Sequence, residues 1–297
     1  MESNLLDRFF AQYKLLVEQR LSEAVSNLNA PVILKESMLY SLEAGGKRIR
    51  PLLLFATLEA FGKDPASGAE AAAAIEMVHT YSLIHDDLPS MDDDALRRGK
   101  PTNHIVYGEA TAILAGDALL THSFRLLADI PEQVADASVK LGLIAGLSDA
   151  AGAEGMVGGQ TADMQGEGKE LSLGELEYIH LNKTGRLLAY SVLAGALLAG
   201  ADAHTREKLS KFAYHLGLAF QIRDDILDLE GTEEQIGKPV GSDEGNKKST
   251  YPSLLSLDGA REALLEHLAK AKEALAGSGL ETSLLEGITD LIGFRNS

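Results

Sequence analysis

The chain has 297 residues, of which 45% are hydrophobic and 5% aromatic, and its 44 acidic and 27 basic residues give a formal net charge of −17. This charge disfavours binding to nucleic acid or to an anionic membrane surface. The absence of cysteine excludes disulfides, thiolate catalysis and thiolate metal sites.

Apolar residues recur at three- and four-residue intervals along almost the whole chain, which predicts helices, whereas strand-like alternation is nearly absent. The first such pattern runs from Leu5 to Val17. Further helices are expected at 32–44, 49–61, 66–87, 110–128, 133–151, 173–199, 203–228, 259–276 and 281–293. We find no internal repeat and no low-complexity linker. The sequence therefore predicts an all-α fold and a single domain over residues 1–297.

Two features of the sequence bear on where the protein resides: residues 1–4 and the most apolar run, 187–201. The first four residues show neither the basic nor the apolar stretch of a secretion signal. The apolar run is too short to span a bilayer, so we expect a helix that is buried on all sides. We therefore expect a cytoplasmic protein without stable membrane insertion.

Two segments, 88–108 and 230–252, contain several glycines and prolines that disfavour helix. Loops of this length inside a compact domain are usually lids or binding loops. Each of them directly follows a group of aspartates, so we expect both loops to border a functional site.

The first aspartate group places five carboxylates within nine residues, from Asp86 to Asp94. Like charges at this spacing raise one another's pKa and repel unless a cation lies between them. On a continuous helix Asp86 and Asp92 would differ by about 240°. They converge only if the helix ends near Asp87, as Pro89 suggests.

The second aspartate group contains Asp224, Asp225 and Asp228. On a helix Asp224 and Asp228 differ by about 40° and share one face. Both groups follow strongly apolar helices, whose C-terminal ends carry partial negative charge and so favour a cation. A site with only oxygen ligands that also shares phosphate oxygens suits Mg²⁺ better than Ca²⁺. The two groups therefore predict a Mg²⁺ site.

Two basic segments stand out in this acidic chain. The run 97–100 follows the first aspartate group and contains Arg97, Arg98 and Lys100. Its position implies a polyanion that bridges the two segments, with arginine forks binding phosphate oxygens. A glycine turn at 45–46 precedes Lys47 and Arg50, which are three residues apart on one helix face and form a second candidate anion site.

These motifs, taken in order, resemble the trans-isoprenyl diphosphate synthases, and among them the bacterial farnesyl diphosphate synthases. The resemblance covers nearly the whole chain. It rests on residues 45–51, 79–85, 86–92, 97–102, 183–185, 220–223, 224–228, 237–238 and 248–252. It implies a bundle of about ten core helices around a deep central cavity, usually built as a homodimer.

The resemblance also implies a role for each matching residue. The two aspartate groups would hold several Mg²⁺ ions around an allylic diphosphate through Asp86, Asp87, Asp92, Asp224, Asp225 and Asp228. Further contacts to the allylic substrate, including the catalytic residues Lys183, Thr184 and Gln221, would come from Arg97, Lys183, Thr184, Gln221, Lys238 and Lys248. Isopentenyl diphosphate would bind at Lys47, Arg50, His79 and Arg98.

The expected reaction condenses isopentenyl diphosphate with dimethylallyl and then geranyl diphosphate to give (E,E)-farnesyl diphosphate. Tyr81 lies five residues before Asp86, about 7.5 Å down the helix at 1.5 Å per residue. The resemblance implies that a bulky ring at Tyr81, next to Ser82, stops growth at farnesyl, whereas a smaller residue gives geranylgeranyl diphosphate. A geranylgeranyl diphosphate synthase is therefore the alternative within the family. Tyr81 could also be ordinary core, with a facing helix as the floor.

Three alternatives come from other functional classes. Glu76 with His79, and Glu177 with His180, fit the spacing of di-iron helical bundles, but that reading leaves the aspartates and arginines unexplained. A terpene cyclase normally mixes Asn, Ser or Thr, and Glu in its second metal site, whereas the second group here contains aspartates. A regulatory subunit usually lacks one aspartate group, and this chain has both. Whether Arg295 reaches the site is left open.

Overall fold

The computed structural model describes residues 2–230 and 248–295, and helices dominate this part of the chain. The longer α-helices are α1 (Glu2–Ser26), α2 (Val32–Leu42), α3 (Ile49–Ala60), α4 (Ala69–Asp86), α6 (Glu109–Ala128), α7 (Ala137–Ala151), α8 (Met156–Gly166), α10 (Arg186–Ala199), α11 (Ala203–Glu230), α14 (Tyr251–Ala276) and α15 (Ser283–Phe294). The shorter elements are η1 (Pro65–Gly68), α5 (Asn103–Tyr107), α9 (Leu173–His180), the π-helical turn η2 (Leu181–Gly185) and the strands β1 (Leu96–Arg97) and β2 (Lys100–Pro101).

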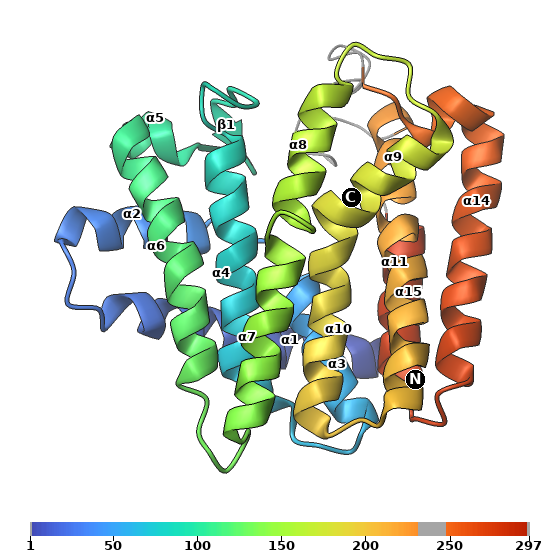
Figure 1. Ribbon diagram of the computed structural model, residues 1–297, viewed down its shortest axis with the longest axis horizontal. Helices are drawn as coiled ribbons and strands as arrows, with labels where there is room; N and C mark the ends of the chain where they lie inside the picture. The colour runs from blue at the N-terminus through green and yellow to red at the C-terminus, as the bar shows by residue number, and fades with distance from the viewer. Residues whose placement is uncertain (1, 231–247, 296–297) are drawn as a thin grey trace.

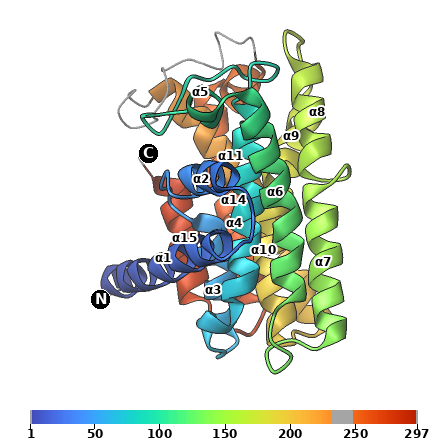
Figure 2. The ribbon, with the colours of Figure 1, turned by 90° about the vertical axis from the view of Figure 1, so that its left-hand side faces the viewer.

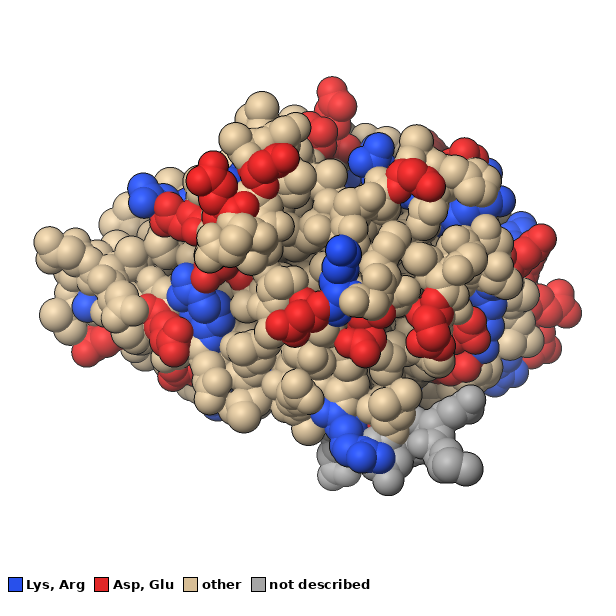
Figure 3. Space-filling model, turned by 90° about the horizontal axis from the view of Figure 1, so that it is seen from below, with Lys and Arg blue, Asp and Glu red and all other residues tan. Residues whose placement is uncertain are grey.

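Most of the long helices stand side by side in a bundle, as Figure 1 shows, and α1 and α2 lie along one side of it (Figure 2). The most extensive contacts join α11 to α14, α4 to α6, and α3 to α10. In Figure 1 α4 and α11 both run upward, so their C-terminal ends lie at the same end of the bundle. Asp86 and Asp228, which lie in the last turns of these two helices, are therefore at that end. On the face seen from below, acidic and basic side chains are interspersed (Figure 3).

Two groups of buried apolar residues form the core. The larger one includes α3, α4 and α10, where alanines such as Ala71 to Ala74 are fully buried and let neighbouring helices approach closely. The smaller one joins α9, α11 and α14 and contains Leu176, Ile222, Ile226 and Tyr251. This smaller core lies around the second aspartate group, because Ile222 and Ile226 flank it on α11.

The expected helices are present, and the all-α bundle is confirmed. The helix expected at 259–276 begins earlier, at Tyr251, because Thr250 and Ser253 form a reciprocal cap and Pro252 occupies a first-turn position. Ser256 inside it has φ 69°, which interrupts the helical pattern that the sequence shows only from 259 onward. None of the described helices has the length and hydropathy of a membrane span.

Helix α8 lies between the helices expected at 133–151 and 173–199, where the sequence predicted none, and its glycines disfavour a helix locally. In the structure they permit close packing instead. A Cβ atom on Gly159 would lie 2.1 Å from the backbone nitrogen of Lys183, so only glycine allows α8 to approach η2 this closely. Segment 88–108 also differs from a plain loop, since it forms the β1–β2 hairpin and α5.

Candidate functional site

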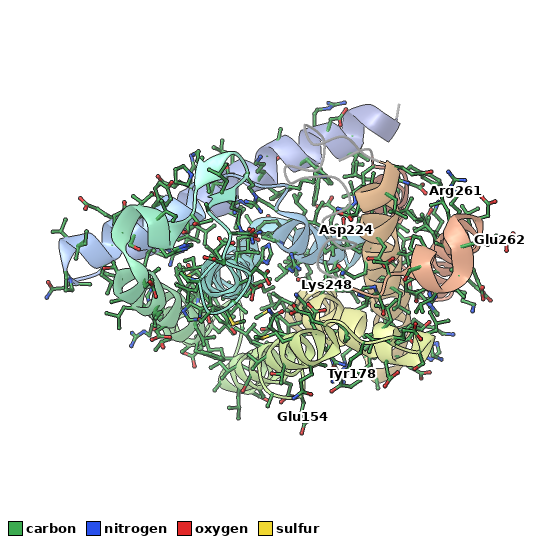
Figure 4. The ribbon with its side chains drawn as sticks, turned by 90° about the horizontal axis from the view of Figure 1, so that it is seen from above. Glu154, Tyr178, Asp224, Lys248, Arg261 and Glu262 are labelled. Carbon is green, nitrogen blue, oxygen red and sulfur yellow. The ribbon has the colours of Figure 1, made fainter. Side chains whose placement is uncertain are left out.

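Both aspartate groups line one polar cavity of about 500 Å³ at the upper end of the bundle. Asp92 comes from the first group, and Asp224 and Asp225 come from the second. The cavity wall also includes five residues that the family resemblance assigned to substrate binding, namely Arg97, Arg98, Lys183, Gln221 and Lys248. Viewed from above in Figure 4, Asp224 and Lys248 lie near the middle of the bundle, whereas Tyr178 and Glu262 lie at its edge. The structure therefore brings the two predicted acidic groups to one place.

The first group converges because α4 ends at Asp86, as its sequence predicts. The chain then turns back, and the Asp92 backbone N–H donates to the Asp86 carbonyl oxygen at 2.9 Å. Burial raises the pKa of Asp86 to about 6; Lys183 and Arg97 oppose this rise, and Asp92 and Asp87 add to it. Crowded carboxylates with such a pKa favour a cation beside them.

Asp87 faces the β1–β2 hairpin, and its carboxylate is bound by Arg97. The Arg97 Nε donates to Oδ1 at 2.8 Å and Nη2 donates to the same oxygen at 2.6 Å. Arg98 and Gly99 form the hairpin turn with φ angles of 54° and 74°, the left-handed pair of a type I′ turn. Asp87 thus orients Arg97 toward the cavity, and its assignment as a Mg²⁺ ligand stays a prediction.

In the second group, Asp224 and Asp225 point in different directions because neighbouring helical residues differ by about 100°. The Asp224 Oδ1 accepts a hydrogen bond from Arg295 Nη2 at 2.6 Å, so this C-terminal arginine does reach the site. The Arg295 guanidinium also lies 4.1 Å from the centre of the Phe220 ring. The Asp225 carboxylate is buried between α9 and α14. Asp228 is also buried and lies outside the described lining of both cavities in this region.

Asp163 on α8 is a site residue that the sequence did not reveal. Its Oδ2 accepts a hydrogen bond from Lys183 Nζ at 2.6 Å and lies 3.6 Å from Lys248 Nζ. Burial alone would raise the pKa of Asp163, but the two lysine charges hold it below its ordinary value. Lys183 and Thr184 lie in the π-helical turn η2, a feature that is frequent at functional sites. Asp163 therefore holds two predicted phosphate ligands at the cavity.

The residues expected to bind a second diphosphate also gather together. The Arg98 guanidinium donates to the Gly45 carbonyl oxygen, which joins the two basic segments. Burial lowers the pKa of Arg50 to about 10, and the charge of Arg98 contributes to this shift. Burial, together with the charges of Arg50 and Arg98, lowers the pKa of His79 well below its ordinary value. No described residue accepts a hydrogen bond from the buried Arg50 Nε. This cluster of positively charged side chains suits the binding of an anion.

Lys47 belongs to the same basic region. Burial lowers its pKa, and the charge of Arg295 lowers it further, whereas Asp224 raises it. The Lys47 ammonium group is thus close enough to Asp224 for their charges to interact. The two candidate anion sites are therefore neighbours.

A second cavity, of about 510 Å³, adjoins the first, since Lys183 lines both. Asp86 and Thr184 also line it, but most of its wall is apolar. The apolar wall comes from α4, α6, α8 and the loop after α4, through Tyr81, Leu83, Leu88, Met91, Ile113, Met156, Val157 and Met164. Tyr81 and Ser82, the two predicted chain-length residues, both line this cavity. Burial and the charge of Asp86 raise the pKa of Tyr81 to about 12, so its hydroxyl stays protonated.

The described residues contain no three His, Asp or Glu side chains close enough together to hold a metal ion by themselves. Mg²⁺ is usually held by one or two carboxylates together with waters and phosphate oxygens of a substrate. The carboxylates of Asp86, Asp92 and Asp224 fit such a shared site, because they offer only oxygen donors beside cations that are predicted to bind phosphate. Lys238, and most of the expected lid 230–252, lie outside the described residues.

The di-iron alternative is not supported, because three of its four side chains contact other protein groups. Glu76 accepts a hydrogen bond from Arg48 Nη1 at 2.7 Å. Glu177 accepts one from the Tyr251 hydroxyl at 3.0 Å, and His180 contacts Asp225. Within the described part of the chain the two pairs do not form a common metal site.

Comparison with known proteins identifies the family of the chain. A model of the polyprenyl synthetase family matches residues 31–278. The chain is 60% identical over 291 residues to a farnesyl diphosphate synthase of Geobacillus stearothermophilus, with 98% of each chain covered. It is 55% identical over 294 residues to that of Bacillus subtilis strain 168, with 99% of each covered. The structure of an FPP/GFPP synthase from Zymomonas mobilis superposes with a TM-score of 0.86 at 34% identity over all of both chains. The chain therefore belongs to the polyprenyl synthetase family.

Proposed function

We propose that this chain is a farnesyl diphosphate synthase, which condenses isopentenyl diphosphate with dimethylallyl and then geranyl diphosphate. One observation carries the proposal: a polar cavity shared by both aspartate groups meets an apolar cavity of similar volume at Lys183. An allylic diphosphate has the matching form, with a charged head and an apolar tail. The similar proteins from Geobacillus and Bacillus carry this activity in their names.

In the allylic site, Arg97, Lys183 and Lys248 bind the diphosphate oxygens, and Asp87 and Asp163 hold these cations in place. Thr184 and Gln221 supply further polar contacts. Asp86, Asp92 and Asp224 would hold Mg²⁺, which, when bound, neutralises the negative charge that develops on the leaving diphosphate.

In the second site, Lys47, Arg50 and Arg98 bind isopentenyl diphosphate. His79 stays neutral beside these cations, because its pKa lies well below the ordinary value, so it contributes a hydrogen bond without further positive charge. Cleavage of the allylic carbon–oxygen bond is followed by attack from the isopentenyl double bond. Loss of a proton to the departing diphosphate restores an allylic diphosphate that is longer by one isoprene unit. The apolar wall around Leu88 and Met91 excludes water from the allylic cation.

The apolar cavity sets the product length, and Tyr81 forms its floor. The Tyr81 ring is buried and meets the His85 ring, one turn further along α4, edge-on at a centroid distance of 5.7 Å. This contact restricts the position of the Tyr81 ring. Replacing Tyr81 with Ala removes this ring, and we expect geranylgeranyl diphosphate as a new product. Tyr81→Phe keeps the ring and serves as the matched control, with farnesyl diphosphate retained. An unchanged product from Tyr81→Ala would place the floor elsewhere.

The decisive experiment incubates the protein with labelled isopentenyl diphosphate and each allylic acceptor, with Mg²⁺, and sizes the products. We expect farnesyl diphosphate from both dimethylallyl and geranyl diphosphate. Absence of transfer to any acceptor would contradict the proposed function. Geranylgeranyl diphosphate as the main product would instead support the alternative within the family.

The proposal includes a homodimer in the cytoplasm. Three large apolar side chains on α5 and the start of α6 are exposed, namely Ile105, Val106 and Leu114, whereas the neighbouring Ile113 also lines the apolar cavity. Exposed apolar side chains that lie close together in the sequence suit a protein partner, and a second copy is the simplest one. Sedimentation of the wild type and of Leu114→Glu tests this. A monomeric wild type would contradict it.

A further inference from the structure

We propose that Asp225 is a positioning residue that anchors the start of α14, and with it Lys248, to α11 and α9. Both aspartates line the polar cavity, and we assign the contact with the ligand to Asp224. The inference deepens the proposed function and rests on it for its kinetic test, but its structural basis is independent of the reaction.

The Asp225 side chain is engaged by two other segments. It is only 5% exposed, and its Oδ2 accepts a hydrogen bond from the Tyr251 backbone N–H at 2.9 Å. The same oxygen lies 3.3 Å from His180 Nε2. The first backbone N–H groups of a helix lack partners within the helix and carry partial positive charge. A carboxylate at this position therefore stabilises the beginning of α14 where it meets α11.

His180 and Tyr251 support this contact from the other side. Their rings stack at a centroid distance of 5.8 Å with an interplanar angle of 9°. The Tyr251 hydroxyl donates to Glu177 Oε1 at 3.0 Å, and Tyr251 is only 1% exposed. Three helices thus meet at one point, with Glu177 and His180 on α9, Asp225 on α11 and Tyr251 on α14. The geometry of the Tyr251 backbone is fixed by several independent contacts.

Fixing Tyr251 also restricts Lys248. Lys248 precedes Tyr251 by three residues, so its Cα atom lies within about 10 Å of the anchored one. Its Nζ reaches the cavity wall beside Asp163, at 3.6 Å from the carboxylate. A cation that is already in place binds a diphosphate without the cost of ordering a free segment. Loss of the Asp225 contact should therefore weaken diphosphate binding through Lys248.

An anchor and a metal ligand respond differently to an amide. The oxygen of an asparagine accepts the Tyr251 N–H as a carboxylate does, but a neutral amide is a poor Mg²⁺ ligand. We therefore compare Asp225→Ala, Asp225→Asn and Asp224→Asn. We measure kcat, KM for geranyl diphosphate and the Mg²⁺ concentration that gives half-maximal turnover. Tyr251→Phe, which removes only the hydroxyl, is the control for general loosening of the contact.

For an anchor, Asp225→Ala raises KM for geranyl diphosphate by about tenfold, since one hydrogen bond to a charged group is lost. Asp225→Asn recovers most of that loss, and neither variant changes the Mg²⁺ requirement. Asp224→Asn raises the Mg²⁺ requirement. If Asp225→Asn is as impaired as Asp225→Ala and raises the Mg²⁺ requirement as Asp224→Asn does, Asp225 is a metal ligand and the inference is overturned.

A second measurement separates this inference from the proposed function. Hydrogen exchange of the Tyr251 amide, without Mg²⁺ or substrate, does not depend on catalysis. We expect exchange to be about tenfold faster in Asp225→Ala and close to wild type in Asp225→Asn. Unchanged exchange in Asp225→Ala would overturn the anchor even if the enzyme makes farnesyl diphosphate. Faster exchange in a protein without transferase activity would reject the proposed function and leave the anchor in place.

Discussion

The two aspartate groups lie at one cavity, yet they are built in different ways. The first is local: Asp92 bonds to the backbone of Asp86, and Asp87 bonds to Arg97 in the hairpin that follows. The second depends on distant segments, since Asp225 is 26 positions from Tyr251 and Asp224 is 71 positions from Arg295. The local group can form from a short stretch of chain. The distant group forms only when α9, α11, α14 and the C-terminal segment have packed together.

Within each group, the second aspartate of the adjacent pair turns toward protein. Asp87 binds Arg97, and Asp225 binds the start of α14. Asp86 and Asp224 line the cavities, and Asp225 also contributes to the wall of the polar cavity although its Oδ2 is engaged by protein groups. The helix explains this division, because adjacent side chains leave the axis about 100° apart. The comparison predicts that the first member of each pair carries the largest effect on turnover.

The largest expected effect comes from replacing Asp86 or Asp224 with Ala. Each change removes a carboxylate from the cation site, and we expect turnover to fall by about 10³-fold or more. Circular dichroism and thermal unfolding should show that the fold persists. The exposed Asp258 on α14 provides the control, and Asp258→Ala should keep wild-type turnover. Near wild-type activity in either cavity variant would contradict the metal assignment of that group.

Breaking the contact between Asp87 and Arg97 should have a smaller effect. Asp87→Ala removes both carboxylate oxygens that accept hydrogen bonds from Arg97, and we expect KM for the allylic diphosphate to rise by about tenfold. The double variant with Arg97→Ala should be little worse than Arg97→Ala alone, because both changes remove the same contact. Strictly additive effects would show that Asp87 does not act through Arg97.

Lys183 lies between the two groups, and its place depends on Gly159. The Cβ of an alanine at 159 would lie 2.1 Å from the Lys183 backbone nitrogen, so α8 or η2 must move. We expect Gly159→Ala to lower the free energy of unfolding by about 1–3 kcal/mol. Gly174→Ala on α9 is the matched control, since no described heavy atom lies within 4 Å of its added Cβ. There we expect a gain of about 0.5–1 kcal/mol. Denaturant titration measures both.

The first aspartate group could be predicted from the sequence because its geometry follows from short-range rules. The stop at Pro89 and the angle between Asp86 and Asp92 require only helix geometry. The ends of most helices were predictable for the same reason. Helix α8 was not, because glycines that disfavour a helix locally are required by its close approach to Lys183. This close approach is a tertiary contact that no local pattern encodes.

Long-range contacts also explain which site residues were missed. Asp163 follows Gly159 in a segment with no other charge, and nothing near it in the sequence indicates two lysines. The contact of Arg295 with Asp224 depends on where α15 packs. The resemblance gave all six aspartates one role, because it compares residue types and not directions. The placement of Asp87 and Asp225 in the structure is what separates them from their neighbours.

The smallest expected effect tests the helix pair that carries the second group. His215 on α11 and His267 on α14 face each other, with their Nδ1 atoms 3.0 Å apart. Burial lowers the pKa of both rings, and the charge of His267 lowers that of His215 further. Lys270 also lowers both pKa values, while Glu266 raises them. Protonation of this pair is therefore disfavoured in the folded protein.

A lowered pKa in the fold means that the unfolded chain binds more protons below pH 6.5. The free energy of unfolding should be highest above pH 6.5 and fall as the pH drops below it. His267→Asn should flatten this decline, and His204→Asn, on the exposed start of α11, should not. Over the same pH range, the protection factor of the Asp92 amide against hydrogen exchange should stay unchanged. The Asp92 amide bonds to the backbone of its own group and not to α14. Parallel loosening of Asp92 and Tyr251 would mean that the two groups form one cooperative unit.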